Sequence, residues 1–213
     1  MRFAAGLLAL GTLAAGSARA ATFTLMRDAP AEVRFTVDAP LDQIVGTSHR
    51  ISGELNFDPN MLSLSGGQVK VDAGSFHTGI ALRDEDLRDQ FLEVQKFPEI
   101  LLTLQKLSRT TSPGLAAGAR VEAEVSGTLA LHGVPHAVTF PISIERSADG
   151  SLITVHGAFE VPFQDYGIQR PQKLFLKLGE LAKIDVRATF TSVPTTDPSI
   201  ATAVAAREAA PQP

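Results

Sequence analysis

The stretch VEAEVSGTLALHGVPHAVTFPISI, residues 121–144, decides the fold class. From Val121 to Leu131 every second residue is apolar or glycine, and the same alternation resumes from Val138 to Ile144. The turn-forming run Gly133-Val134-Pro135 lies between the two segments. Since successive side chains of a strand point to opposite faces, this pattern predicts two antiparallel strands, each with one apolar and one polar face.

The same alternation recurs on both sides of these two strands. It is found in the ranges 33–37, 51–57, 69–73, 100–104, 153–163 and 184–190, although Leu101 and Leu107 interrupt the fourth. About eight amphipathic strands predict an all-β fold with an antiparallel sheet that is wetted on one side. Eight such strands can close into a barrel and so remove their edges, and we expect a barrel rather than a sandwich.

One segment breaks this rhythm, and it predicts one short helix near residues 84–95. Acidic residues at its start suit a helix N-terminus, and Pro98 stops the run. Asp84 and Arg88 are four residues apart, so they can pair, and an ion-pair network at the helix start is the preferred interpretation of Arg83, Asp84 and Arg88. Four residues of this segment are predicted to have a structural role, in which they hold the helix over an opening of the barrel. The residues given that role are Arg83, Asp84, Leu87 and Arg88.

The two ends of the chain are not expected to belong to the barrel. Residues 1–20 contain Arg2, an apolar run and Ala18-Arg19-Ala20, which is the pattern of a secretory signal peptide. Residues 193–213 are rich in Ala, Pro and Thr, which predicts a disordered tail. The remaining residues, 21–192, form one predicted domain. The signal predicts a periplasmic or secreted protein with no membrane span after cleavage.

Composition narrows the classes of function. The chain has 213 residues, a formal net charge of −4 and no cysteine. The mild acidity argues against a nucleic-acid partner, which requires a basic face. The absence of cysteine excludes a disulfide scaffold, a thiolate metal site and a cysteine nucleophile.

The inward face of the predicted barrel suits an apolar ligand. Gly53, Gly127 and Gly157 fall at the alternate strand positions that face the interior of the predicted barrel. There they either relieve strand curvature or leave room for a ligand. The chain has 12 Phe, one Tyr and no Trp, which favours a hydrocarbon ligand over a sugar or a nucleobase. The candidate channel-lining residues share the inward parity: Val33, Phe35, Val37, Leu55, Phe57, Leu129, Leu131, Phe140, Ile142, Phe159 and Phe163.

Catalytic and metal-binding patterns are weak. His132 and His136 flank the tight turn and could face each other across it, but two imidazoles are too few for a tight zinc site. The sequence lacks the His-Glu-x-x-His and Gly-x-Ser-x-Gly motifs. We therefore expect a binding protein with no catalytic residue, metal or cofactor. Two alternatives stay open: a surface interaction module with a filled core and, less favoured, a histidine-based metal-dependent enzyme.

Several motifs taken together resemble the signatures of the YceI-like family. They are Ile44-Val45-Gly46-Thr47, Gly53 to Pro59, Ser75-Phe76-His77-Thr78-Gly79 with Arg83 to Arg88, Gly127 to Val134, and Asp165-Tyr166-Gly167-Ile168. The family usually has a Lys or Arg and then a proline after the His-Gly-Val-Thr turn, which corresponds here to the turn that begins at His132. Here these positions hold Pro135-His136-Ala137, a departure that concerns the mouth of the channel more than the fold.

The resemblance implies a lipocalin-like antiparallel barrel in the bacterial periplasm. It implies that a long apolar channel holds a polyisoprenoid or an isoprenoid quinone, with the protein acting as carrier, reservoir or sensor. It implies no catalytic residue. The sequence does not determine the oligomeric state, and a homodimer is one of the states that it allows.

Overall fold

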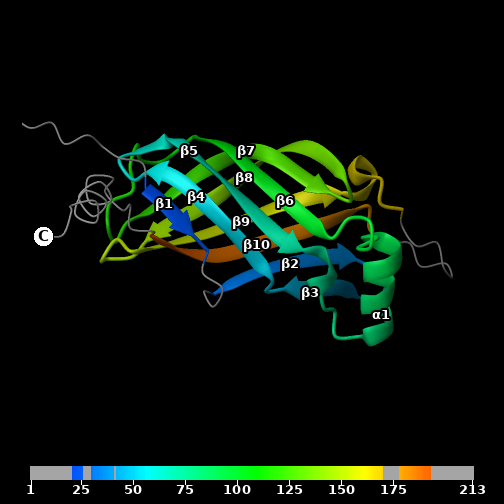
Figure 1. The fold of residues 1–213 in the computed structure, drawn as a ribbon. Helices are drawn as coiled ribbons and strands as arrows, with labels where there is room; N and C mark the ends of the chain where they lie inside the picture. The colour runs from blue at the N-terminus through cyan, green and yellow to red at the C-terminus, as the bar shows by residue number, and fades with distance from the viewer. Residues whose placement is uncertain (1–20, 26–29, 41, 170–177, 193–213) are drawn as a thin grey trace, which may run out of the picture.

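The computed structural model describes residues 21–25, 30–40, 42–169 and 178–192, which fold into ten strands and a few short helical segments (Figure 1). The predicted signal peptide and tail lie outside the described residues. The strands are β1 (Ala21–Thr24), β2 (Ala31–Asp38), β3 (Gln43–Ser48), β4 (Ile51–Asp58), β5 (Met61–Asp72), β6 (Glu99–Ser108), β7 (Arg120–Leu131), β8 (Val134–Arg146), β9 (Leu152–Pro162) and β10 (Leu181–Ser192).

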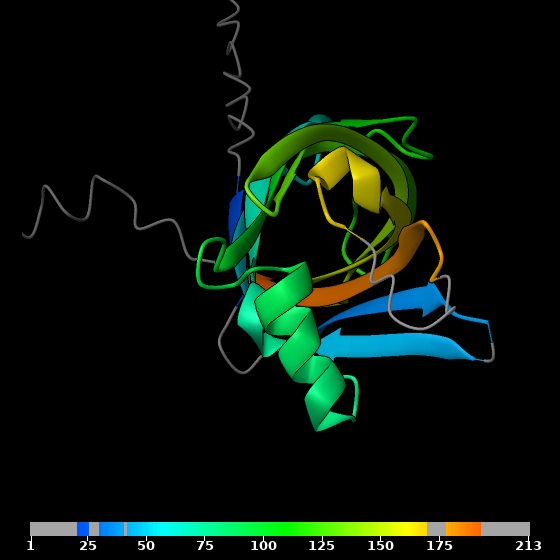
Figure 2. The same ribbon diagram turned by 90° about the vertical axis from the view of Figure 1, so that its right-hand side faces the viewer.

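Eight of these strands form a closed antiparallel ring. Its order is β1-β4-β5-β6-β7-β8-β9-β10, and β1 pairs with β10 to complete it. The pairing that closes the ring involves few residues, with Phe23 opposite Ser192 and Thr24 opposite Thr191. Figure 2 looks into this ring. The predicted antiparallel barrel of about eight strands is therefore confirmed.

The strands β2 and β3 form a ribbon that branches from the ring. β2 pairs with the first half of β10, from Lys183 to Ala188, whereas β1 pairs with the last residues of β10. β3 stands at the end of the sheet order. One further bridge, between Thr47 and His77, joins it to the segment that follows β5. In Figure 2 the ribbon lies below the ring and beside α1. Neither β1 nor β3 was among the strands predicted from the alternation.

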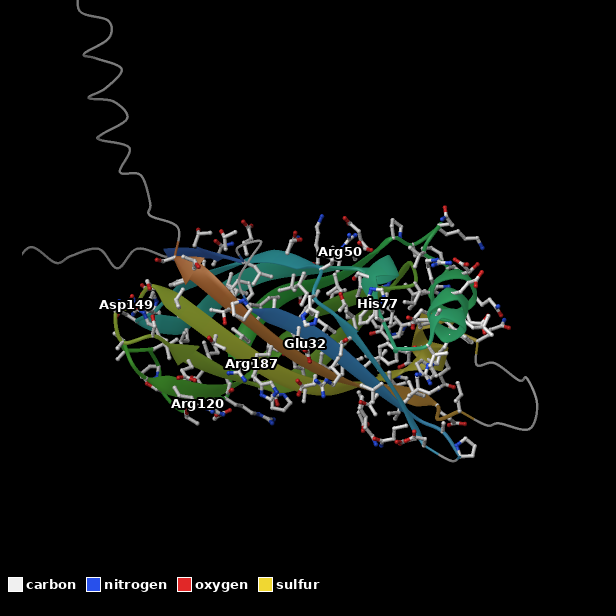
Figure 3. The ribbon with its side chains drawn as sticks, turned by 90° about the horizontal axis from the view of Figure 1, so that it is seen from below. Glu32, Arg50, His77, Arg120, Asp149 and Arg187 are labelled. Atoms are coloured by element: carbon white, nitrogen blue, oxygen red, sulfur yellow. The ribbon has the colours of Figure 1, made fainter. Side chains whose placement is uncertain are left out.

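Alternation along the strands places apolar side chains inside and polar ones outside. In β7 every odd-numbered residue from Val121 to Leu131 is buried. Outward positions carry charges, as where Arg187 of β10 lies opposite Glu32 of β2 (Figure 3). In β6 the register shifts between Leu104 and Lys106, and this bulge turns Leu107 inward, where it is 3% exposed. The apparent break at Leu107 in the sequence is thus a bulge within one continuous strand.

The helical segment starts and ends earlier than predicted. α1 (Ala81–Asp86) continues into the wider turn η2 (Leu87–Phe91), so the segment covers 81–91 rather than 84–95. It ends there because the N–H of Leu92 bonds to the Leu87 carbonyl and Glu93 takes a positive φ of 44°. Two short 3-10 turns, η1 (Ala73–Ser75) and η3 (Phe163–Tyr166), follow β5 and β9. No helix among the described residues is both long and apolar enough to cross a bilayer.

The predicted ion pair between Asp84 and Arg88 is wrong. The Asp84 carboxylate accepts hydrogen bonds from Thr78, through the backbone N–H at 2.7 Å and the hydroxyl at 2.5 Å. Arg88 instead binds its neighbour Asp89, with Nε 2.8 Å from Oδ1. The spacing suits an ion pair within the helix, but Asp84 is already hydrogen-bonded to Thr78 in the turn before the helix.

Candidate ligand-binding site

An inner cavity of about 170 Å³ lies within the ring. It is lined by residues of β2 and of β4 to β10, together with Phe76 from the segment after β5. Every lining residue is apolar or glycine. The barrel interior is therefore not completely filled by its own side chains, and the space left is one that water does not favour.

An outer cavity of about 150 Å³ lies between the β2–β3 ribbon, the helical segment and the start of β10. Phe35 and Ile44 line it from the ribbon, and Leu87 and Phe91 line it from the helical segment. Its wall also includes three polar residues: Thr78, Arg83 and Gln169. The helical segment thus covers a mostly apolar space beside the ribbon.

The two cavities are neighbours that share one wall. The residues that line both are Phe76, Ile100, Leu131, Val161 and Ile184. Phe76 is buried, and its ring meets that of Phe35 edge to face, with the ring centres 5.5 Å apart. The two cavities therefore adjoin, one inside the ring and the other beside the helical segment.

The structure places ten of the eleven candidate channel residues around these cavities. Those at the inner cavity are Val33, Leu55, Leu129, Leu131, Phe140, Ile142 and Phe159. Those at the outer cavity are Phe35, Val37 and Phe163, with Leu131 reaching both. The side chain of Phe57 lies outside the described part. That any of these residues contacts a ligand stays a prediction.

Sequence reasoning missed the part of the wall that comes from outside the regular strands. Phe76 follows a short helical turn, and Phe91, Leu92 and Ile168 lie in helical or irregular segments. None of them belongs to an alternating run, so parity could not assign them a face. Leu87, which was given a structural role, lines the outer cavity as well.

The inward glycines serve two different purposes. A β-carbon at Gly53 would stand 2.4 Å from the Gln68 carbonyl oxygen, and one at Gly127 would stand 2.2 Å from that of Thr103. These two glycines permit close approach of neighbouring strands. Gly157 lines the inner cavity, where a β-carbon would meet the side chains of Ile142 and Phe140. It is therefore the glycine of this group that leaves room in the cavity wall.

The start of the helical segment is held by a small polar cluster. Arg83 donates from Nε to the Thr78 hydroxyl at 2.8 Å and from Nη2 to the Thr78 carbonyl at 2.9 Å. The same hydroxyl donates to Asp84. These hydrogen bonds from Thr78 hold the pKa of the Asp84 carboxyl below its ordinary value, so this group is ionised at neutral pH.

His132 and His136 both contact Tyr166 rather than forming a paired site. His132 bonds through Nδ1 to the Tyr166 carbonyl at 3.0 Å and through Nε2 to Glu93 at 2.8 Å. The His136 ring packs edge to face on the Tyr166 ring, with centres 5.1 Å apart. Across the residues that the structure describes, no three His, Asp or Glu side chains are grouped as a metal site would require. The histidines fasten η3 against the turn between β7 and β8.

Comparison with known proteins gives one family and several similar folds. The family model described as the YceI-like domain matches residues 25–190. A polyisoprenoid binding domain from Saccharophagus degradans, implicated in plant cell wall breakdown, is 19% identical with a TM-score of 0.65, covering 82% of this chain and all of that one (100%). BcnA from Burkholderia cenocepacia is 15% identical with a TM-score of 0.63, covering 76% of this chain and 99% of its own.

A third solved structure has a similar fold. The YceI protein of Campylobacter jejuni is 17% identical with a TM-score of 0.57, covering 72% of this chain and 86% of that one. No curated protein matches the chain significantly. At these identities the structural neighbours show the fold alone.

Proposed function

The chain belongs to the YceI-like domain family, and from that premise we propose that it binds a long-chain isoprenoid lipid, either a polyisoprenoid or an isoprenoid quinone. The observation that carries the proposal is the pair of adjoining cavities, of which the inner is lined only by apolar residues and glycine and the outer mostly so. A prenyl chain would lie along this space, from the helix into the ring.

The chemistry of the inner wall favours hydrocarbon. Because the lining holds no polar side chain, a sugar, nucleotide or peptide would lose its hydrogen bonds with water and gain none there. An isoprenoid chain loses no hydrogen bond on entry and gains about 0.8 kcal/mol for each methylene that it buries. The polyisoprenoid binding domain from Saccharophagus degradans shares this fold, which supports the same ligand class.

We propose a binding role in the bacterial periplasm, as carrier, reservoir or sensor, without catalysis or a cofactor. The signal-peptide pattern of residues 1–20 supports the location. The hollow interior argues against the alternative of a surface module with a filled core. The histidine-based enzyme is also disfavoured, because both ring nitrogens of His132 already have partners in the fold.

Native mass spectrometry of the full chain, followed by organic extraction, tests the proposal. The protein purified from its own periplasm is expected to carry extra mass that extracts as an isoprenoid. Val155→Phe puts a large ring at the wall of the inner cavity and should sharply reduce that mass. Ala158→Phe, on the exposed face of the same strand, is the matched control and should carry as much lipid as the wild type. A wild-type protein with no bound lipid under gentle conditions would refute the proposal.

A further inference from the structure

We propose that Arg83 receives an oxygen atom at one end of the lipid, so that the ligand binds in a single direction. The oxygen-bearing end would lie at the helical segment, and the hydrocarbon tail would fill the inner cavity. This inference rests on the proposed function and adds the orientation of the ligand and the chemistry of its head.

The first argument is the uneven distribution of polar residues along the apolar space. The inner cavity has none in its wall, whereas the outer cavity has Thr78, Arg83 and Gln169. A polar head placed in the inner cavity would be buried without a hydrogen-bond partner, which is costly. Placed in the outer cavity, the same head meets a cation. An amphiphile would therefore enter with its tail towards the ring.

The second argument is the bonding state of Arg83. Its hydrogen-bond partners are the hydroxyl and the carbonyl of Thr78, which use only part of the donors of the guanidinium. Among the described residues, no carboxylate lies within ion-pair distance of it. Arg88, on the same helical segment, is by contrast paired with Asp89. Arg83 thus keeps both its charge and free N–H groups at the wall of an apolar cavity.

The third argument is that Thr78 and Asp84 fix the position of Arg83. Asp84 accepts from the Thr78 N–H and hydroxyl, and Thr78 in turn accepts from Arg83. Oδ1 of Asp84 is bonded to Thr78 and Oδ2 lies 3.6 Å from Nδ1 of His77, so the carboxylate is directed to these two residues rather than to the guanidinium. A half-buried arginine that is held in place can donate to an oxygen such as a quinone carbonyl or a prenyl phosphate.

Binding of three probes to the full-length protein tests this inference. The probes are geranylgeranyl phosphate, a naphthoquinone with a geranylgeranyl side chain, and squalene, which has no oxygen. Arg83→Met keeps the length of the side chain but removes every donor. It should weaken binding of at least one oxygen-bearing probe about tenfold or more and leave squalene unchanged. Which of the two is weakened distinguishes a phosphate from a carbonyl head.

Arg88→Met is the matched control, since Arg88 lies on the same helical segment, is exposed and lines neither cavity. It should change none of the three affinities. Arg83→Gln, which keeps a neutral donor for Thr78, should give an intermediate loss for the sensitive probe.

Three outcomes separate the possible failures. Unchanged binding of both oxygen-bearing probes by Arg83→Met would overturn the inference while leaving the proposed function intact. Equal loss of all three probes in both Arg83 variants would also overturn it, because it would assign Arg83 to the fold alone. Failure of the wild type to bind any of the three would refute the proposed function itself.

Discussion

The ring of Phe35 occupies the space in which Gly46 would carry a side chain. The two residues are opposite each other in β2 and β3, and a β-carbon at Gly46 would stand 2.3 Å from Cε1 of Phe35. With no side chain there, the Phe35 ring lies across the ribbon and reaches Phe76 at the wall shared by both cavities. The glycine therefore determines the shape of the outer cavity.

Gly46→Ala should displace the Phe35 ring and disturb both folding and lipid content. The added methyl group overlaps the ring, and such overpacking costs about 1–3 kcal/mol of unfolding free energy. Thermal unfolding measures the first effect, and lipid extracted per protein measures the second. Gly66→Ala is the control for thermal unfolding alone, because a β-carbon there would meet nothing closer than 3.6 Å but Gly66 lines the inner cavity. Unaltered stability and lipid content in Gly46→Ala would contradict this interpretation.

Phe140→Asp should abolish lipid retention. Phe140 is buried, stacks on Phe159 with ring centres 4.3 Å apart and lines the inner cavity. A carboxylate at that position would carry its hydration into the apolar space or leave a charge buried there. Thr139→Asp, exposed on the outer face of the same strand, should retain lipid. A folded Phe140→Asp protein with wild-type lipid content would remove Phe140 from the predicted channel.

His132→Ala should destabilise the protein by about 1–2 kcal/mol, since it removes the hydrogen bonds to the Tyr166 carbonyl and to Glu93. The side chain of His132 is only 13% exposed, so water does not readily replace these bonds. Thermal unfolding measures the loss. Added zinc should not shift the unfolding temperature of the wild type. A zinc-dependent shift that disappears in His132→Ala would instead support a metal site.

Asp149 should make stability depend on pH in the acid range. Hydrogen bonds from Ser147 and Ser151 lower the pKa of Asp149 from 3.8 to about 2. A group whose pKa is lower in the folded state stabilises the fold above its unfolded pKa, and this is lost as pH falls through the folded value. The stability advantage of the wild type over Asp149→Asn should therefore shrink between pH 3.8 and about 2. Denaturant unfolding across this range tests it, and a constant difference would contradict it.

The sequence was sufficient to predict the barrel because its strands are long and wetted on one side, as from Val121 to Leu131. It did not reveal β1, which has only four residues, nor β3, where Gly46 and Thr47 blur the alternation. Parity assigns a residue to a face but does not say which strand leaves the ring. It therefore could not predict that β2 and β1 share β10, or that a second cavity lies beneath the ribbon.

The irregular part of the site was harder to predict for a physical reason. The helical segment starts where it does because Thr78 and Asp84 bond across the preceding turn, a contact that no periodic pattern encodes. Phe76 directly follows the separate 3-10 turn η1, and the bridge between Thr47 and His77 joins its neighbour to the ribbon. Side chains placed by local hydrogen bonds need the structure, whereas side chains placed by alternation do not.

The pairing of β1 with β10 also bears on the order in which the strands pair during folding. It joins Phe23 to Ser192, close to the two ends of the described domain. The strands β4 to β9 can pair by successive neighbouring contacts, but the ring cannot close until β10 is in place. Contacts between such distant residues form slowly, because a long loop must close first. Until then the apolar faces of the other strands remain exposed to water, so we expect closure of the interior to be a late step of folding.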